Sequence, residues 1–130
     1  MNEVEKPLIL IVDDEPNFRD IWKTKLENSG FSVLTAENGK AALEILKSYK
    51  PKIILLDILM PEMDGVETFF AIKENPELKD TKIFFVTALD DLDAELGKYH
   101  KKIAGEIGAV GYLRKGADLD ELVHTLKKNV

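Results

Sequence analysis

Several kinds of residue are missing or scarce in this chain, and each absence excludes a class of protein. None of the 130 residues is cysteine, which excludes a disulfide framework and thiolate chemistry. Histidine occurs only at His100 and His124, and neither follows an apolar run, so we expect no histidine-based metal site or catalytic triad. No apolar stretch approaches the ~20 residues that a membrane-spanning helix needs, and the polar N-terminus is unlike a signal peptide. We therefore expect a cytoplasmic protein that is not inserted in a membrane.

A surplus of basic residues is also missing. The formal net charge is −6. Affinity for nucleic acid comes largely from neutralising phosphates, so we expect no direct nucleic-acid binding by this chain. Its length fits one domain, and it contains no internal repeat, low-complexity tract or interdomain linker. We expect residues 1–130 to form a single domain, with no second domain attached.

What the chain does have is a set of short apolar runs that each stop at a polar residue. Residues 8–12 precede Asp13 and Asp14, residues 53–56 precede Asp57, residues 83–86 precede Thr87, and residues 111–114 precede Lys115. Short runs without polar alternation are typical of strands buried on both faces of a parallel sheet. The carboxyl ends of such strands meet at one edge, where ligands bind. We therefore expect these five polar residues to share one pocket.

Between these runs the apolar spacing becomes helical. Helices are predicted from Pro16 to about 28, from 38–39 to about 46, over 66–74, over 98–107, and after Asp118, which can cap its helix with Glu121 as partner. One more strand is predicted over 31–36. The residues expected to face the sheet include Phe18, Ile21, Trp22 (partly buried), Leu26, Ala42, Leu43, Ile45, Leu46, Phe69, Phe70, Ile72, Leu119, Leu122, Val123 and Leu126. Five strands alternating with five helices predict an α/β fold, a doubly wound five-stranded parallel sheet in three α/β/α layers.

Three carboxylates in one pocket repel one another unless a cation compensates them. Oxygen ligands without histidine or cysteine suit Mg²⁺, and Mn²⁺ also fits. We expect Asp14 and Asp57 to be direct ligands, Asp13 to act directly or through water, and the backbone carbonyl of Leu59 to complete the protein ligands.

A carboxylate beside a metal, a hydroxyl and an ammonium suits phosphoryl transfer, because an aspartate can act as the nucleophile. Asp57 is then expected to attack phosphorus. Lys115 and the metal would hold the phosphoryl oxygens, and Thr87 would hydrogen-bond one of them after transfer.

The order and spacing of these residues closely resemble the receiver domains of two-component response regulators. The residues that carry the resemblance are Asp13, Asp14, Asp57, Met60, Pro61, Asp64, Gly65, Thr87, Ala88, Gly108, Ala109, Tyr112 and Lys115. The resemblance spans essentially the whole chain and implies the strand order 2-1-3-4-5. It describes a signalling domain, not an enzyme with a separate substrate, and no output domain is expected here.

The resemblance also implies a mechanism. Asp57 would receive its phosphoryl group from a phosphohistidine on a sensor histidine kinase or phosphotransfer protein, with Mg²⁺ as cofactor. Thr87 would move toward the phosphoryl group, and the ring of Tyr112 would turn inward. These movements would change the face made by the fourth helix, fifth strand and fifth helix, where an unidentified downstream protein docks or the chain forms a phosphorylation-dependent homodimer.

Four features depart from the family pattern. Gly116 stands where a proline usually follows the lysine, and the stretch near 90–100 is several residues longer than usual. Leu59 and Leu89 occupy two positions where polar groups orient the water that hydrolyses the acyl phosphate in the family. Leucine cannot orient that water. We hypothesise slow autodephosphorylation.

Three other functions remain as alternatives. A receiver-shaped interaction module that does not use phosphate is compatible with Gly116 and the insertion. A Mg²⁺-dependent phosphohydrolase would commonly need an acid two residues after its nucleophile, where this chain has Leu59. A flavodoxin-like cofactor protein would need a glycine- and hydroxyl-rich phosphate loop, where this chain has residues 13–15, all acidic.

Overall fold

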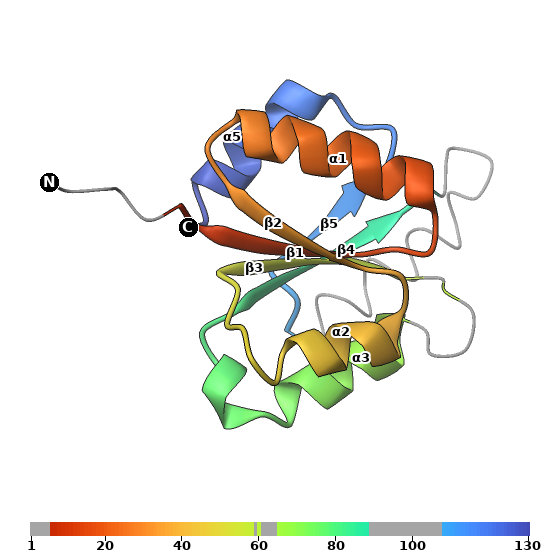
Figure 1. Ribbon diagram of the computed structural model, residues 1–130, viewed down its shortest axis with the longest axis vertical. Helices are drawn as coiled ribbons and strands as arrows, with labels where there is room; N and C mark the ends of the chain where they lie inside the picture. Colours follow the sequence, from red (N-terminus) through yellow and green to blue (C-terminus); the bar gives the residue numbers. More distant parts are fainter. Residues whose placement is uncertain (1–5, 59, 61–64, 89–107) are drawn as a thin grey trace, which may run out of the picture.

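A five-stranded parallel sheet forms the centre of the molecule in the computed structural model, which describes residues 6–58, 60, 65–88 and 108–130 (Figure 1). The strands are β1 (Leu8–Val12), β2 (Ser32–Ala36), β3 (Ile53–Asp57), β4 (Lys82–Thr87) and β5 (Gly111–Arg114). Their order is β2-β1-β3-β4-β5, and each neighbouring pair is parallel. The predicted fold class and strand order are confirmed.

Helices cover both faces of this sheet. They are α1 (Pro16–Asn28), α2 (Gly39–Ile45), α3 (Gly65–Lys73), the short 3-10 helix η1 (Pro76–Leu78) and α5 (Leu119–Lys127). Helices α1 and α5 lie on one face, and α2 and α3 lie on the other (Figure 1). The helix predicted over 98–107 lies outside the described residues. No helix within the described part of the chain is long and apolar enough to cross a membrane.

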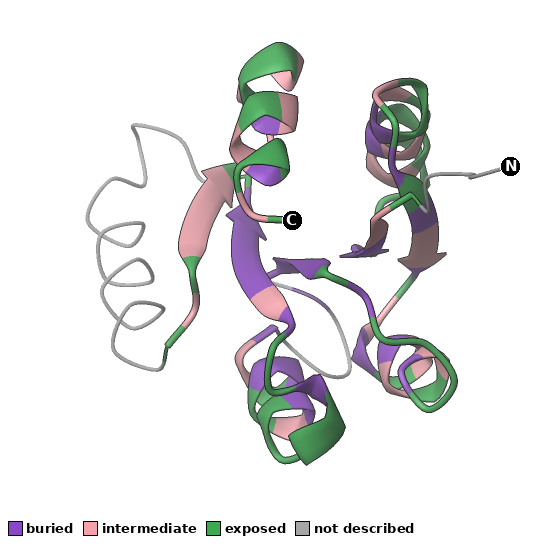
Figure 2. Ribbon diagram, turned by 90° about the vertical axis from the view of Figure 1, so that its left-hand side faces the viewer, coloured by how far each residue is buried: buried purple, intermediate pink, exposed green. Residues whose placement is uncertain are grey.

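The central strands bury side chains on both faces, which explains why their sequences do not alternate. Along β1, Ile9 and Ile11 join a core cluster with residues of α1 and α5. Leu10 and Val12 join a second cluster with residues of α2 and α3. Burying each such side chain stabilises the fold by roughly 1.5–3 kcal/mol. Figure 2 shows the gradient across the sheet, from buried central strands to β5, whose residues are only partly buried or exposed.

Three predictions about helix faces are wrong in detail. Trp22 is only 2% exposed rather than partly buried, because it packs with Phe31 and Leu26 between α1 and the sheet. Ile21 and Phe70 were expected in the core, but they are 56% and 50% exposed. Each lies next to a buried residue on its helix, and adjacent helical positions point about 100° apart. The buried stripe is therefore narrower than the apolar pattern suggests.

Candidate functional site

The carboxyl ends of the strands meet because backbone hydrogen bonds continue past the strands themselves. The Asp13 N–H donates to the Ala36 carbonyl at 3.0 Å, which ties the end of β1 to the end of β2. The Lys115 N–H donates to the Thr87 carbonyl at 2.8 Å, which ties the segment after β5 to the end of β4. Asp57 pairs with Val86 in the sheet, so it lies one register step from Thr87. The polar residues predicted to share an edge do share it.

Three carboxylates come together at this edge. Asp13, Asp14 and Asp57 each have an oxygen within 4.8 Å of the others. Asp13 and Asp57 are buried, whereas Asp14 is exposed. The Asp13 carboxylate is held by the backbone, because the Glu15 N–H donates to its Oδ1 at 2.8 Å. The site therefore has two buried carboxylates, one of them held by the backbone, and a third that faces solvent.

Lys115 enters this cluster from the loop after β5. Its Nζ lies 2.7 Å from Asp13 Oδ2, 3.3 Å from Asp57 Oδ2 and 2.8 Å from Glu15 Oε1. The side chain is only 11% exposed, and Nζ lies 4.8 Å from the centre of the Phe18 ring. Burial on its own would lower the pKa of this ammonium, but the hydrogen bonds and charges of Asp13, Glu15 and Asp57 outweigh it and raise the pKa above its usual value. Lys115 is therefore charged at any physiological pH.

The carboxylate cluster fits a hard divalent cation. The three clustered carboxylates, two of them buried, have only one ammonium among them, and Lys115 shares that ammonium with Glu15 as well. The Oδ2 atom of Asp13 is buried, and its partner there is the Lys115 ammonium at 2.7 Å. One ammonium does not compensate three clustered carboxylates, and an all-oxygen set favours Mg²⁺ or Mn²⁺ as the further cation. Leu59, the predicted carbonyl ligand, lies outside the described residues.

The two residues of the expected switch lie on adjacent strands. Thr87 is buried at the end of β4. Tyr112 lies on β5, where it pairs with Phe85 of β4, and it packs against the core on the α2–α3 face. The Tyr112 hydroxyl is buried and has no hydrogen-bond partner among the described residues. Within the described part of the chain, therefore, no hydrogen bond fixes the Tyr112 ring in this position.

Some features of the site were not identified from sequence. Gly65 begins α3 directly against the end of β3, where an added Cβ would overlap the Asp57 carbonyl oxygen and lie 2.7 Å from Ile58 Cα. From sequence, Gly65 stands out only as one of the residues that carry the family resemblance, and nothing there indicates this close approach. Gly116 is the opposite case, because an added Cβ there would meet nothing within 4 Å. The contacts of Glu15 and Phe18 with Lys115 also had no local signal.

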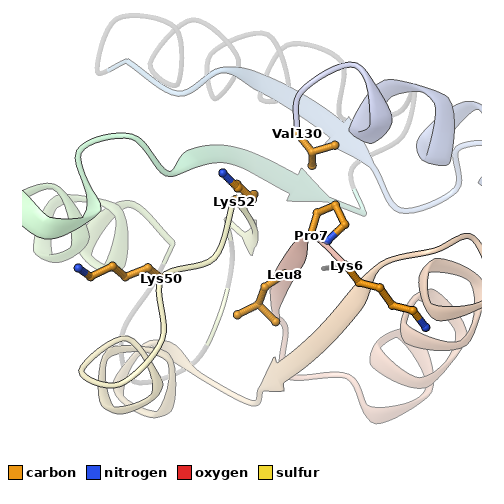
Figure 3. Close-up of a pocket in the computed structure, with 6 residues that line it drawn as sticks. All are labelled: Lys6, Pro7, Leu8, Lys50, Lys52 and Val130. Carbon is orange, nitrogen blue, oxygen red and sulfur yellow. The ribbon is translucent and has the colours of Figure 1, made fainter. Parts of the chain in front are cut away.

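A depression lies at the end of the sheet opposite the carboxylates, near the start of β1 (Figure 3). It has a volume of about 310 Å³ and is lined by Lys6, Pro7, Leu8, Lys50, Lys52 and Val130. The three lysines are exposed, and Figure 3 shows that Lys6 extends away from Lys50 and Lys52. Their ammonium groups do not converge on one point, so this depression lacks the concentrated charge of the carboxyl edge.

The chain is similar along most of its length to one family of proteins. Residues 9–127 match the response regulator receiver domain family. The chain is 32% identical over 127 residues to the DNA-binding transcriptional regulator NtrC of Escherichia coli, a match that covers 98% of this chain and 25% of NtrC. It is 39% identical over 120 residues to the transcriptional regulatory protein CrdR of Helicobacter pylori, covering 92% of this chain and 53% of CrdR.

Solved structures give the same result. The chemotaxis response regulator CheY4 of Vibrio cholerae superimposes with a TM-score of 0.85 at 27% identity, covering 97% of this chain and 100% of that one. A response regulator from Thermotoga maritima superimposes with a TM-score of 0.77 at 28% identity, covering 95% and 97%. The chain spans only a quarter to about half of the length of the two curated regulators. In sequence, strand order and edge geometry alike, the chain belongs to the response regulator receiver domain family.

Proposed function

We propose that Asp57 accepts a phosphoryl group from a phosphohistidine of a sensor histidine kinase or phosphotransfer protein, in a reaction that depends on Mg²⁺. Receiver domains are signalling modules of two-component systems and act with such a kinase or phosphotransfer partner. One observation carries the proposal. Asp57 is a buried carboxylate that lies both within reach of two other carboxylates and 3.3 Å from an ammonium.

The reaction is an in-line substitution at phosphorus. A carboxylate oxygen of Asp57 forms the new O–P bond as the N–P bond of the phosphohistidine breaks, and the electron pair of that bond stays on the histidine nitrogen. Negative charge on the phosphoryl oxygens must be stabilised throughout, and positioned cations supply most of the catalysis in such transfers. Lys115 supplies one such charge from a position set by the backbone bond to Thr87.

Asp13, Asp14 and Asp57 would hold the Mg²⁺ ion, with the Leu59 carbonyl as the further ligand predicted from sequence. A bound Mg²⁺ would neutralise charge on the phosphoryl oxygens and on the crowded carboxylates. The backbone bond from Glu15 to Asp13 fixes one carboxylate before any cation arrives, and such preorganisation reduces the cost of binding.

We also propose that Thr87 and Tyr112 transmit the change. Thr87 would hydrogen-bond a phosphoryl oxygen, and the Tyr112 ring would turn inward as Thr87 moves. The buried hydroxyl of Tyr112 has no hydrogen-bond partner among the described residues, and this supports the role, because a ring that no such bond holds can be displaced at low cost. The changed surface of β5 and α5 would then bind a downstream protein or a second copy of the chain.

The proposal is tested by intact mass after incubation with acetyl phosphate or phosphoramidate, with and without Mg²⁺. Wild type should gain one phosphoryl group only with Mg²⁺, Asp57→Ala should gain none, and Asp20→Ala, which removes an exposed carboxylate of α1, should behave as wild type. Absence of any gain in the wild type would refute the proposal. The hypothesis of an interaction module that does not use phosphate would then be favoured.

We further propose that the phosphoryl group is lost slowly, because Leu59 and Leu89 cannot orient an attacking water. Both residues lie outside the described part of the chain, so the hypothesis rests on the family resemblance. The half-life of the phosphorylated wild type should exceed that of a Leu59→Asn, Leu89→Glu double variant. An equal or shorter half-life would refute it.

A further inference from the structure

Glu15 occupies the N-cap of α1 but does not cap it. In α2, η1 and α5, the N-cap side chains Asn38, Asn75 and Asp118 accept hydrogen bonds from the first turn of the helix. The Glu15 side chain makes no such bond. Its Oε1 instead accepts a hydrogen bond from Lys115 Nζ at 2.8 Å, across 100 residues of sequence. The Glu15 side chain therefore pairs with Lys115 and does not cap its own helix.

The surroundings of Lys115 show what this contact competes with. An ammonium has three N–H donors, and three carboxylates surround this one, those of Asp13, Asp57 and Glu15. The Phe18 ring lies beside it at 4.8 Å. Asp13 and Asp57 are buried, whereas the Glu15 side chain is 60% exposed. Glu15 is thus the partner that an incoming oxyanion can most readily replace.

We propose that Glu15 is a positioning residue that holds Lys115 in the resting state and competes with the phosphoryl group for its ammonium. This inference rests on the proposed function of Asp57. A phosphoryl oxygen on Asp57 needs a donor from Lys115, and in the resting state the three donors face the carboxylates of Asp13, Asp57 and Glu15. Glu15 thereby weakens the affinity of the site for the phosphoryl group and favours the resting state.

The first test measures the affinity for beryllofluoride, a phosphoryl analogue, in the presence of Mg²⁺ by NMR titration. Glu15→Gln should tighten binding by about two- to fivefold, the range expected from one exposed ion pair. Removal of a negative charge near the site would also tighten binding, so Glu37→Gln is the matched control. Glu37 is exposed and follows β2 at the same edge of the sheet. Equal effects of the two variants would overturn the proposal.

A second test asks whether Glu15 acts through Lys115. A double-mutant cycle of Glu15→Gln and Lys115→Ala is measured by chemical unfolding without metal. The two changes should couple by about two- to fivefold in the ratio of folded to unfolded protein. In beryllofluoride binding, Glu15→Gln should lose its effect in the Lys115→Ala background. Absence of coupling in the cycle would overturn the proposal, as would a tightening that persists without Lys115.

The two measurements separate this inference from the proposed function. If wild type binds neither the phosphoryl group nor beryllofluoride, the function of Asp57 is wrong, and the competition fails with it. If wild type binds beryllofluoride and the cycle shows coupling, but Glu15→Gln does not tighten binding more than Glu37→Gln, the function stands. Glu15 is then only a structural ion-pair partner.

Discussion

The two ends of the sheet carry opposite charges, but only the carboxyl end concentrates its charge. There, Asp13 and Asp57 are buried, and one ammonium lies within 3.3 Å of both. At the amino end, Lys6, Lys50 and Lys52 border a depression of about 310 Å³, yet they are exposed and do not converge. Charges in a low-dielectric site interact strongly, whereas exposed charges are screened. Convergence and burial, rather than the size of a depression, distinguish the reactive end.

This concentration of charge has a cost in the resting molecule. Lys115 offsets only one of the three carboxylates of Asp13, Asp14 and Asp57. The remaining repulsion opposes folding and at the same time favours a cation. The carboxyl end therefore gives up some stability in favour of affinity for a cation, whereas the exposed lysines of the amino end carry no comparable buried repulsion. The following predictions test this contrast.

The largest expected effect is on phosphorylation. Asp13→Asn should slow the Mg²⁺-dependent gain of a phosphoryl group by at least about 10- to 100-fold, because it replaces a proposed cation ligand that is buried. The triple variant Lys6→Gln, Lys50→Gln, Lys52→Gln removes the charge of the amino end and should stay within about twofold of wild type. Both are measured by intact mass over time with a small-molecule phosphodonor. A slow triple variant would show that the amino end also contributes to the reaction.

The next effect is on stability without metal. Lys115→Ala removes the ammonium that contacts the buried carboxylates of Asp13 and Asp57, and loss of one partner from a fully buried pair costs about 3–5 kcal/mol. We expect about 2–3 kcal/mol here, because the Lys115 side chain is 11% exposed and the pair is therefore not fully buried. Chemical unfolding with a chelator measures this loss, and addition of Mg²⁺ should restore part of it. Lys52→Ala, at the amino end, should change the free energy of unfolding by less than about 0.5 kcal/mol. An equal loss of stability in both variants would contradict the difference between the two ends of the sheet.

A smaller effect has the opposite sign. Asp57→Asn removes one of three mutually repelling carboxylates while its shape is kept, so the metal-free protein should gain about 1 kcal/mol of stability. Lys115 keeps its contacts with Asp13 and Glu15 in this variant. Unfolding curves with and without Mg²⁺ check the prediction, since the variant should also gain less from Mg²⁺. A loss of stability without metal would mean that attraction to Lys115 outweighs the repulsion.

Much of the fold and of this edge could be predicted because the signals are local. The length of each apolar run and the polar residue that ends it are read directly from sequence, and parallel strands bring those ends together. The contact of Glu15 with Lys115 could not be predicted, since it joins residues 100 positions apart. The exposure of Ile21 and Phe70 was missed because both lie at the border of an apolar helical stripe. At that border the sequence spacing does not distinguish a buried residue from its exposed neighbour, and tertiary packing determines which one is buried.

The smallest effect lies away from both ends, in the ion pair between α1 and α5. Lys25 Nζ lies 2.6 Å from Asp120 Oδ1 on the surface. The hydrogen bond and charge of Lys25 lower the pKa of Asp120 below its ordinary value of 3.8. A lowered pKa in the folded state means that the pair stabilises the fold above pH 3.8, and that this contribution is lost as the pH falls through the lowered pKa.

The difference in unfolding free energy between wild type and Asp120→Asn should therefore be small and constant near neutral pH and should shrink in acid. High salt should also reduce it, because the pair is exposed. Asp80→Asn, which removes another exposed carboxylate, is the matched control. A difference that is insensitive to salt would mean that the pair acts through packing of α5 on α1 and not through charge. By contrast, the buried charges around Lys115 should respond to salt least of all, since water and ions reach them poorly.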